Sequence, residues 1–182
     1  MSLSSLALFL HVTGALLLFV TLTVEGIALR LLRRAATSAE AAGASAMLRV
    51  NRIVGPISAI GVLVPGLYMT ATNWGAAAWI VVALISWALI AVLGAFNGIR
   101  VLALQRLLAQ EGGSSAMAQL RNPLFFVSWL TRVGIALGVI FLMTVKPGAL
   151  GSVIVVVIAA GAGMAVGVGL VAGRFNREGQ VA

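Results

Sequence analysis

The chain has 182 residues, of which 62% are hydrophobic and 9% are charged, and its formal net charge is +8. A soluble domain is usually about a quarter charged, so this composition excludes a fold whose whole surface faces water. The cations lie in separate segments without a stacking platform or a binding motif, which indicates anionic lipid headgroups as partners and no nucleic acid.

Five apolar segments are long enough to cross a membrane. The hydrocarbon core is about 30 Å thick and requires about 20 residues of helix. Continuous runs of this length satisfy their backbone hydrogen bonds as helices, whereas barrel strands would be short and alternating. The sequence therefore predicts an all-α, polytopic transmembrane helical bundle, one domain over residues 1–182, with five spans at about 4–29, 53–72, 74–104, 124–145 and 150–173.

The first span, which contains "LFLHVTGALLLFVTLTVEGIALR", carries the chain's only histidine, His11, and one of its four acids, Glu25. The two residues are fourteen positions apart, so they share one helix face at a separation of about 21 Å. No cation precedes the segment, and its apolar stretch is about twice the usual length of a signal-peptide core. We expect it to remain in the mature protein.

Two linkers of about 20 residues follow the first and the third predicted spans. "RRAATSAEAAGASAMLRVNR" is expected to extend the first helix and to break near Gly43, and "LQRLLAQEGGSSAMAQLRN" is expected to break at Gly112 and Gly113. Neither linker is long enough to form a separate domain.

The second span contains Pro56 and Pro65, and the stretch "ATNWGAA" follows it. Prolines inside a membrane helix either shape its packing or free carbonyl groups for a ligand, as in transporters. The stretch after the span predicts a tight turn with Trp74 at the membrane interface.

Arg132 lies in the fourth span, about ten residues beyond the expected helix start at Asn122 and Pro123. An arginine at mid-membrane costs about 2.5 to 3.5 kcal/mol on insertion scales, so it needs a partner or a water path. Glu25 is the only acid within the predicted spans, which predicts an ion pair between the first and fourth helices. The pair could fix helix packing or serve a proton or ion path; the alternative is an unpaired Arg132 that reaches the interface.

A second candidate site combines His11 with two methionines near the same membrane face, Met69 and Met143. Imidazole and thioether ligands suit Cu(I), and haem would need an axial histidine with a second strong ligand such as methionine. The alternative is packing, because methionine fills gaps in apolar interiors and a membrane histidine often bonds a backbone carbonyl.

Small residues recur at four-residue steps in the third, fourth and fifth spans. This spacing lets helices approach closely, either within the chain or in a homo-oligomer. The pattern is formed by Gly94 and Gly98, Gly134 and Gly138, and two rows in the fifth span, Ala159, Gly163 and Gly167 and also Ala165, Gly169 and Gly173.

The arginines predict the orientation of the chain. They flank one end of the predicted spans, whereas Lys146 alone marks the other end. Because Lys and Arg are retained in the cytoplasm, we expect the N-terminus outside and the C-terminus inside.

The segments "FLHVTGALLLF", "PISAIGVLVPGLYMTATNWG" and "LMTVKPG" resemble those of an uncharacterised family of small bacterial integral membrane proteins, which is similar in turn to the membrane part of copper-resistance D proteins. The resemblance covers most of residues 1–150. It implies a helical bundle in the bacterial cytoplasmic (plasma) membrane, and it implies metal handling at His11 and at Met143–Gly148.

Enzyme chemistry finds little support in the sequence. There is no Asp or Cys, no Ser–His–acid set, no HExxH motif and no phosphate-binding glycine loop. We therefore expect a non-enzymatic integral membrane protein without a cofactor, with a structural or accessory role. One alternative is a copper- or haem-handling protein that uses His11, and another is a small-solute or proton transporter that uses Glu25 and Arg132.

Overall fold

The computed structural model describes residues 2–110 and 122–178. Five helices, each long and apolar enough to cross a membrane, make up this part of the chain with one π-helical turn, which confirms the predicted all-helical, five-span architecture. The elements are α1 (Leu3–Arg34), α2 (Ser38–Met69), η1 (Thr70–Trp74), α3 (Ala78–Gln110), α5 (Pro123–Val145) and α6 (Ala149–Glu178).

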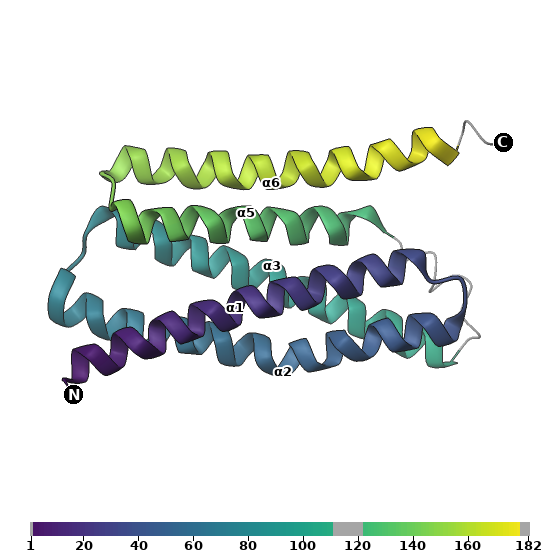
Figure 1. Ribbon diagram of the computed structural model, residues 1–182, viewed down its shortest axis with the longest axis horizontal. Coiled ribbons are helices and arrows are strands. Elements are labelled where there is room, and N and C mark those ends of the chain that lie inside the picture. The colour runs from purple at the N-terminus through teal and green to yellow at the C-terminus, as the bar shows by residue number, and fades with distance from the viewer. Residues whose placement is uncertain (1, 111–121, 179–182) are drawn as a thin grey trace.

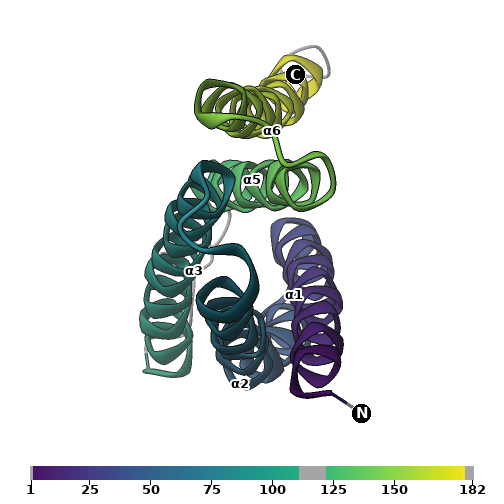
Figure 2. The ribbon, with the colours of Figure 1, turned by 90° about the vertical axis from the view of Figure 1, so that its left-hand side faces the viewer.

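The helices run roughly parallel or antiparallel to one long axis (Figure 1). The N-terminus, η1 and the α5–α6 connection lie at one end of this axis, and the α1–α2 connection and the C-terminus lie at the other. Seen along the axis, α1, α2 and α3 form one group, α5 lies across it, and α6 packs on the far side of α5 (Figure 2). The outer surface of the bundle is apolar: Ile53, Val92 and Leu150, for example, are 68%, 66% and 75% exposed. Such a surface is suited to lipid and not to water.

Helix α2 begins fifteen residues earlier than the sequence analysis predicted. Thr37 caps it by accepting a hydrogen bond from the Glu40 backbone N–H at 3.3 Å, and the Glu40 carboxylate accepts one from the Ala36 N–H at 2.9 Å. This is a variant of the capping box, in which a Thr and a Glu three residues later satisfy free N–H groups at a helix start. The expected linker therefore shrinks to residues 35–37, and the predicted break near Gly43 is wrong because the helix continues through it.

Other predicted boundaries also move. Helix α2 continues through both Pro56 and Pro65, and the π-helical turn η1 replaces the expected tight turn. The chain reverses at Gly75, whose φ of 64° is a left-handed conformation that glycine adopts without steric cost. Helix α3 extends to Gln110, and the breaks expected at Gly112 and Gly113 lie outside the described residues.

Glycines bring α5 and α6 close together. A Cβ atom added to Gly134 or Gly163 would overlap backbone atoms of the facing helix, and one added to Gly167 would lie 3.0 Å from the Val127 Cα. The predicted packing row through Gly163 and Gly167 therefore faces α5. The second predicted row does not: Gly169 has open space around it, so it takes no part in packing within the described chain, and its use in a homo-oligomer stays a prediction. The side-chain position of Gly173 lies outside the described residues.

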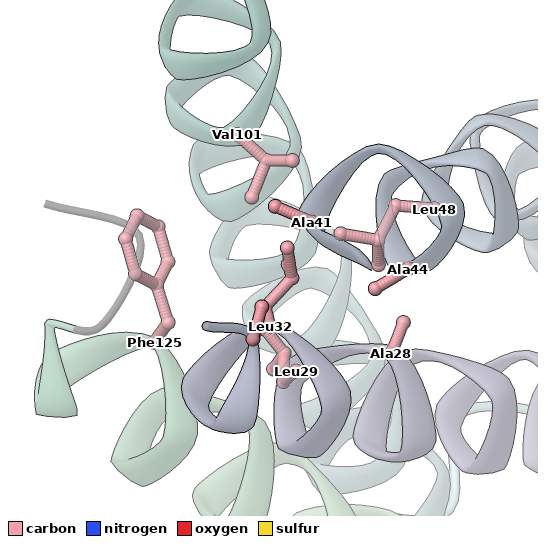
Figure 3. Close-up of a cluster of buried hydrophobic side chains, with 9 residues drawn as sticks. Ala28, Leu29, Leu32, Ala41, Ala44, Leu48, Val101 and Phe125 are labelled. Atoms are coloured by element: carbon pink, nitrogen blue, oxygen red, sulfur yellow. The ribbon is translucent and has the colours of Figure 1, made fainter. Parts of the chain in front are cut away.

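An apolar cluster joins four helices near the α1–α2 connection (Figure 3). Leu29 and Leu32 of α1 project toward α2, α3 and α5, and Leu32 is 1% exposed. The other buried members are Ala28, Ala35, Ala41, Ala44, Leu48, Val101 and Phe125. This cluster fills the interior of the bundle at the end that holds the α1–α2 connection.

Trp129 of α5 lies against a glycine of α1. Its indole Nε1–H donates a hydrogen bond to the Leu22 carbonyl at 2.7 Å, and its ring occupies the space where a side chain at position 26 would begin. Gly26 is therefore required for the contact between α1 and α5.

We expect Gly26→Ala to lower the free energy of unfolding by about 1 to 3 kcal/mol, because the added methyl group overlaps the Trp129 ring. Gly43→Ala is the matched control, since it also adds a methyl group in a helix but has open space, and its higher helix propensity should stabilise by up to about 1 kcal/mol. Denaturation of both variants in detergent micelles measures the difference. Equal stability of the two variants would contradict the proposed contact.

Candidate ligand-binding groove between α2 and α3

Glu25 and Arg132 form an ion pair inside the bundle. The Arg132 Nη2–H donates to the Glu25 Oε1. The Arg132 side chain is 5% exposed and the Glu25 side chain is 12% exposed. Gly94 of α3 makes room for the guanidinium, because a Cβ there would lie only 3.0 Å from Arg132 Nη1. The pair expected between the first and fourth spans is therefore present, and it depends on a small residue of the third.

A cavity of about 370 Å³ adjoins this pair. Thr21, Leu22 and Ile90 are buried at its floor together with Arg132, and it extends along α3 from Trp87 to Leu102. The lining residues at its rim are exposed and belong to α2 and α3: Arg52, Pro56, Ala95 and Ile99. The cavity is thus a groove that opens sideways between these two helices, and we call it the α2–α3 groove.

The polar groups of the groove are concentrated around the ion pair. Asn51 donates its amide N–H to the Thr21 carbonyl at 3.0 Å, which fixes this turn of α2 against α1. Arg52 follows directly and is exposed at the rim, with no ion pair or hydrogen bond to the described residues. The Nε of Arg132 is buried and also has no hydrogen-bond partner in this part of the chain. The groove therefore holds two arginines and one carboxylate, a formal excess of one positive charge.

Small residues and a proline create the space. Gly55, Ala59, Gly94 and Gly98 line the groove where larger side chains would fill it. Pro56 has no N–H, so the carbonyl of Arg52 lacks its helical donor at the groove wall. A smaller cavity of about 80 Å³ continues from Glu25 to Leu48, Val101 and Phe125 of the apolar cluster, which separates the groove from the end of the bundle.

His11 is used by the contact between α1 and α2. Its Nδ1–H donates to the Val62 carbonyl at 2.8 Å, and Gly66 leaves room for the ring, with only 3.1 Å between the imidazole and a Cβ placed there. Val62 neighbours Gly61, whose carbonyl lacks a helical donor because Pro65 has no N–H. The histidine thus stabilises α2 close to its proline interruption.

The other two residues of the predicted copper site lie on different helices. Met69 is the last residue of α2, and Met143 packs against the buried cluster that includes Leu22, Ala83 and Leu142. Among the described residues, no three His, Cys, Asp or Glu side chains gather in a group that could hold a metal ion, and the His11, Met69 and Met143 site stays a prediction. His11 is therefore the single strong ligand candidate at that position.

Asn51 and Arg52 are groove residues that the sequence analysis placed in a linker. Their assignment followed from the late start predicted for α2. The signal that identifies them is "TSAE", residues 37–40, because a capping box there starts a helix whose apolar face continues into the second span.

We expect the Glu25 and Arg132 substitutions to be strongly coupled. Glu25→Ala should cost about 3 to 5 kcal/mol of stability, because it leaves a buried guanidinium without its carboxylate. The double variant Glu25→Ala, Arg132→Ala should be more stable than the sum of the single effects predicts, by at least about 1 kcal/mol. Unfolding in detergent micelles measures this cycle. Glu40→Ala combined with Arg132→Ala is the control, since Glu40 caps α2 and its effect should simply add; an additive Glu25 cycle would refute the coupling.

No family model, curated protein or solved structure matches the chain significantly. The resemblance to small bacterial membrane proteins and to copper-resistance D proteins therefore stays a prediction.

Proposed function

We propose that the chain is a non-enzymatic, multi-pass protein of the bacterial cytoplasmic membrane that binds a small ligand in the α2–α3 groove, as a transporter or carrier would. The observation that carries this proposal is the cavity of about 370 Å³ beside the Glu25–Arg132 pair. Ionisable groups at membrane depth are candidates for a functional site, above all where a cavity adjoins them.

A purely structural or accessory role explains these features less well. Hydrophobic residues of similar volume often pack at least as well as a buried ion pair, and an unfilled cavity costs stability. Arg52 at the rim of the groove makes no ion pair or hydrogen bond with the described residues, so it forms no polar contact between helices. The hydrogen bond from His11 to Val62, in contrast, supports a structural role for that residue more than a copper or haem site.

The distribution of cations supports an orientation with the N-terminus outside. Arg30, Arg34, Arg100 and Arg106 are exposed toward the end of the bundle that holds the α1–α2 connection. At the opposite end, Lys146 lies over the Trp74 ring at 3.9 Å, an arrangement suited to an interface. The arginine-rich end is then cytoplasmic.

This orientation predicts which surfaces a membrane-impermeant thiol reagent reaches in intact cells. The chain has no cysteine, so single-cysteine variants can be labelled without background. Ala76→Cys, near Gly75, should react from outside, and Ala42→Cys, at the arginine-rich end, should react only after permeabilisation; both positions are exposed. The reverse pattern would overturn the proposed orientation.

The ligand-binding proposal predicts that the groove admits a water-soluble reagent. In nanodiscs of zwitterionic lipid, Ala95→Cys at the groove rim should react with a charged methanethiosulfonate at least about tenfold faster than Phe96→Cys. Phe96 is the matched control because it is 51% exposed at the same depth of α3 but does not line the groove. Equal rates would mean that the groove is closed to water and would contradict binding of a ligand that enters from water.

A further inference from the structure

The α2–α3 groove has a charged part and an apolar part, arranged along α3. The fifteen helical steps from Trp87 to Leu102 extend over about 22 Å. Arg52, Glu25 and Arg132 lie beside the half that is nearer the arginine-rich end, whereas Leu18, Ala59 and Trp87 line the other half. A ligand that fills this groove needs a polar head and an apolar tail.

The charges of the groove select the sign of that head. Two arginines and one carboxylate line the groove, and neither the Arg52 side chain nor the Nε of Arg132 has a hydrogen-bond partner among the described residues. A phosphate or carboxylate could accept hydrogen bonds from both arginines, because a guanidinium binds planar or tetrahedral anions through several N–H groups.

The position of the opening indicates where the ligand comes from. The apolar cluster around Leu32 and Phe125 lies between the ion pair and the end of the bundle, while exposed residues of α2 and α3 flank the lateral mouth. The hydrogen bond from Asn51 to the Thr21 carbonyl sets this turn of α2 beside Thr21, which lies about 20 Å before Arg34 along α1. Access is therefore sideways between α2 and α3, from the lipid layer.

We propose that the α2–α3 groove binds an anionic phospholipid of the membrane, with its phosphate at Arg52 and Arg132 and one acyl chain along α3 toward Trp87. This assignment rests on the proposed ligand-binding function and names its ligand class. It also gives Arg52 a role that the ion pair does not: its guanidinium at the rim attracts the headgroup. Leu18 and Ala59 line the path of the acyl chain toward Trp87.

Fluorescence quenching by brominated lipids tests the proposal, because Trp87 lines the apolar half of the groove. The full-length protein is placed in phosphatidylcholine nanodiscs, and part of the lipid is replaced by phosphatidylglycerol brominated on one acyl chain. The Trp87 contribution is the difference between the wild type and Trp87→Phe. We expect this contribution to be quenched at a several-fold lower fraction of brominated phosphatidylglycerol than of brominated phosphatidylcholine. Equal quenching by the two lipids would overturn the proposal.

Arg52→Gln supplies the decisive variant, and Arg49→Gln supplies its matched control. Both arginines are exposed on α2 and each substitution removes one positive charge, but only Arg52 lines the groove. Arg52→Gln should reduce the preference for the anionic lipid roughly fivefold, whereas Arg49→Gln should retain it. Equal losses in the two variants would reveal a surface-charge effect and overturn the site.

A third probe separates the two sources of an anionic amphiphile. Brominated stearate carries the same head charge and chain without a glycerol backbone, and stronger quenching by stearate than by phosphatidylglycerol would overturn the phospholipid assignment.

The thiol-labelling experiment distinguishes the lipid proposal from the ligand-binding function on which it rests. Rapid labelling of Ala95→Cys together with no lipid preference would refute the lipid alone, whereas absent labelling together with no lipid preference would refute the binding function itself.

Discussion

The contact between Glu25 and Arg132 is the constraint on which the arrangement of this bundle depends. Each charge alone would be expensive at membrane depth, and together they require α1 and α5 to meet at one register. The indole of Trp129 supports the same register from one turn away through its bond to the Leu22 carbonyl. Gly26 and Gly94 provide the space in which these side chains fit. Two glycines and two charges thus align three helices.

Small residues have two different effects in the rest of the molecule. Between α5 and α6, Gly134 and Gly163 allow backbones to touch, and the interface is filled. Between α2 and α3, Gly55 and Gly98 have no neighbouring atoms within contact distance of an added Cβ, and a groove results. The difference lies in the neighbouring helix: α6 follows α5 closely along its length, whereas α2 and α3 flank the groove that Arg132 and Glu25 line at its floor. In the absence of a hydrophobic driving force between membrane helices, such van der Waals contact decides which pairs associate closely.

Proline also has two local consequences in α2. Near Pro65, His11 bonds to the Val62 carbonyl, which neighbours the freed Gly61 carbonyl, and near Pro56 the freed carbonyl of Arg52 borders an open groove. The missing proline N–H therefore lies beside a hydrogen bond between two helices at one position and leaves an exposed polar group at the other. His11 and Arg52 thus each lie close to a proline of α2.

The sequence by itself determined the class of the molecule, since apolar runs of about 20 residues can satisfy their backbone only as membrane helices. It also determined the Glu25–Arg132 pair, because a single intramembrane acid and a single deep arginine leave few alternatives. Helix boundaries were less predictable: Arg52 was assigned to a linker because local composition masked the helix start at Ser38. The groove, the role of Gly169 and the partner of His11 were decided only by the tertiary structure. These features depend on which face of one helix meets another and how far apart the backbones stay, and helical periodicity alone gives neither quantity.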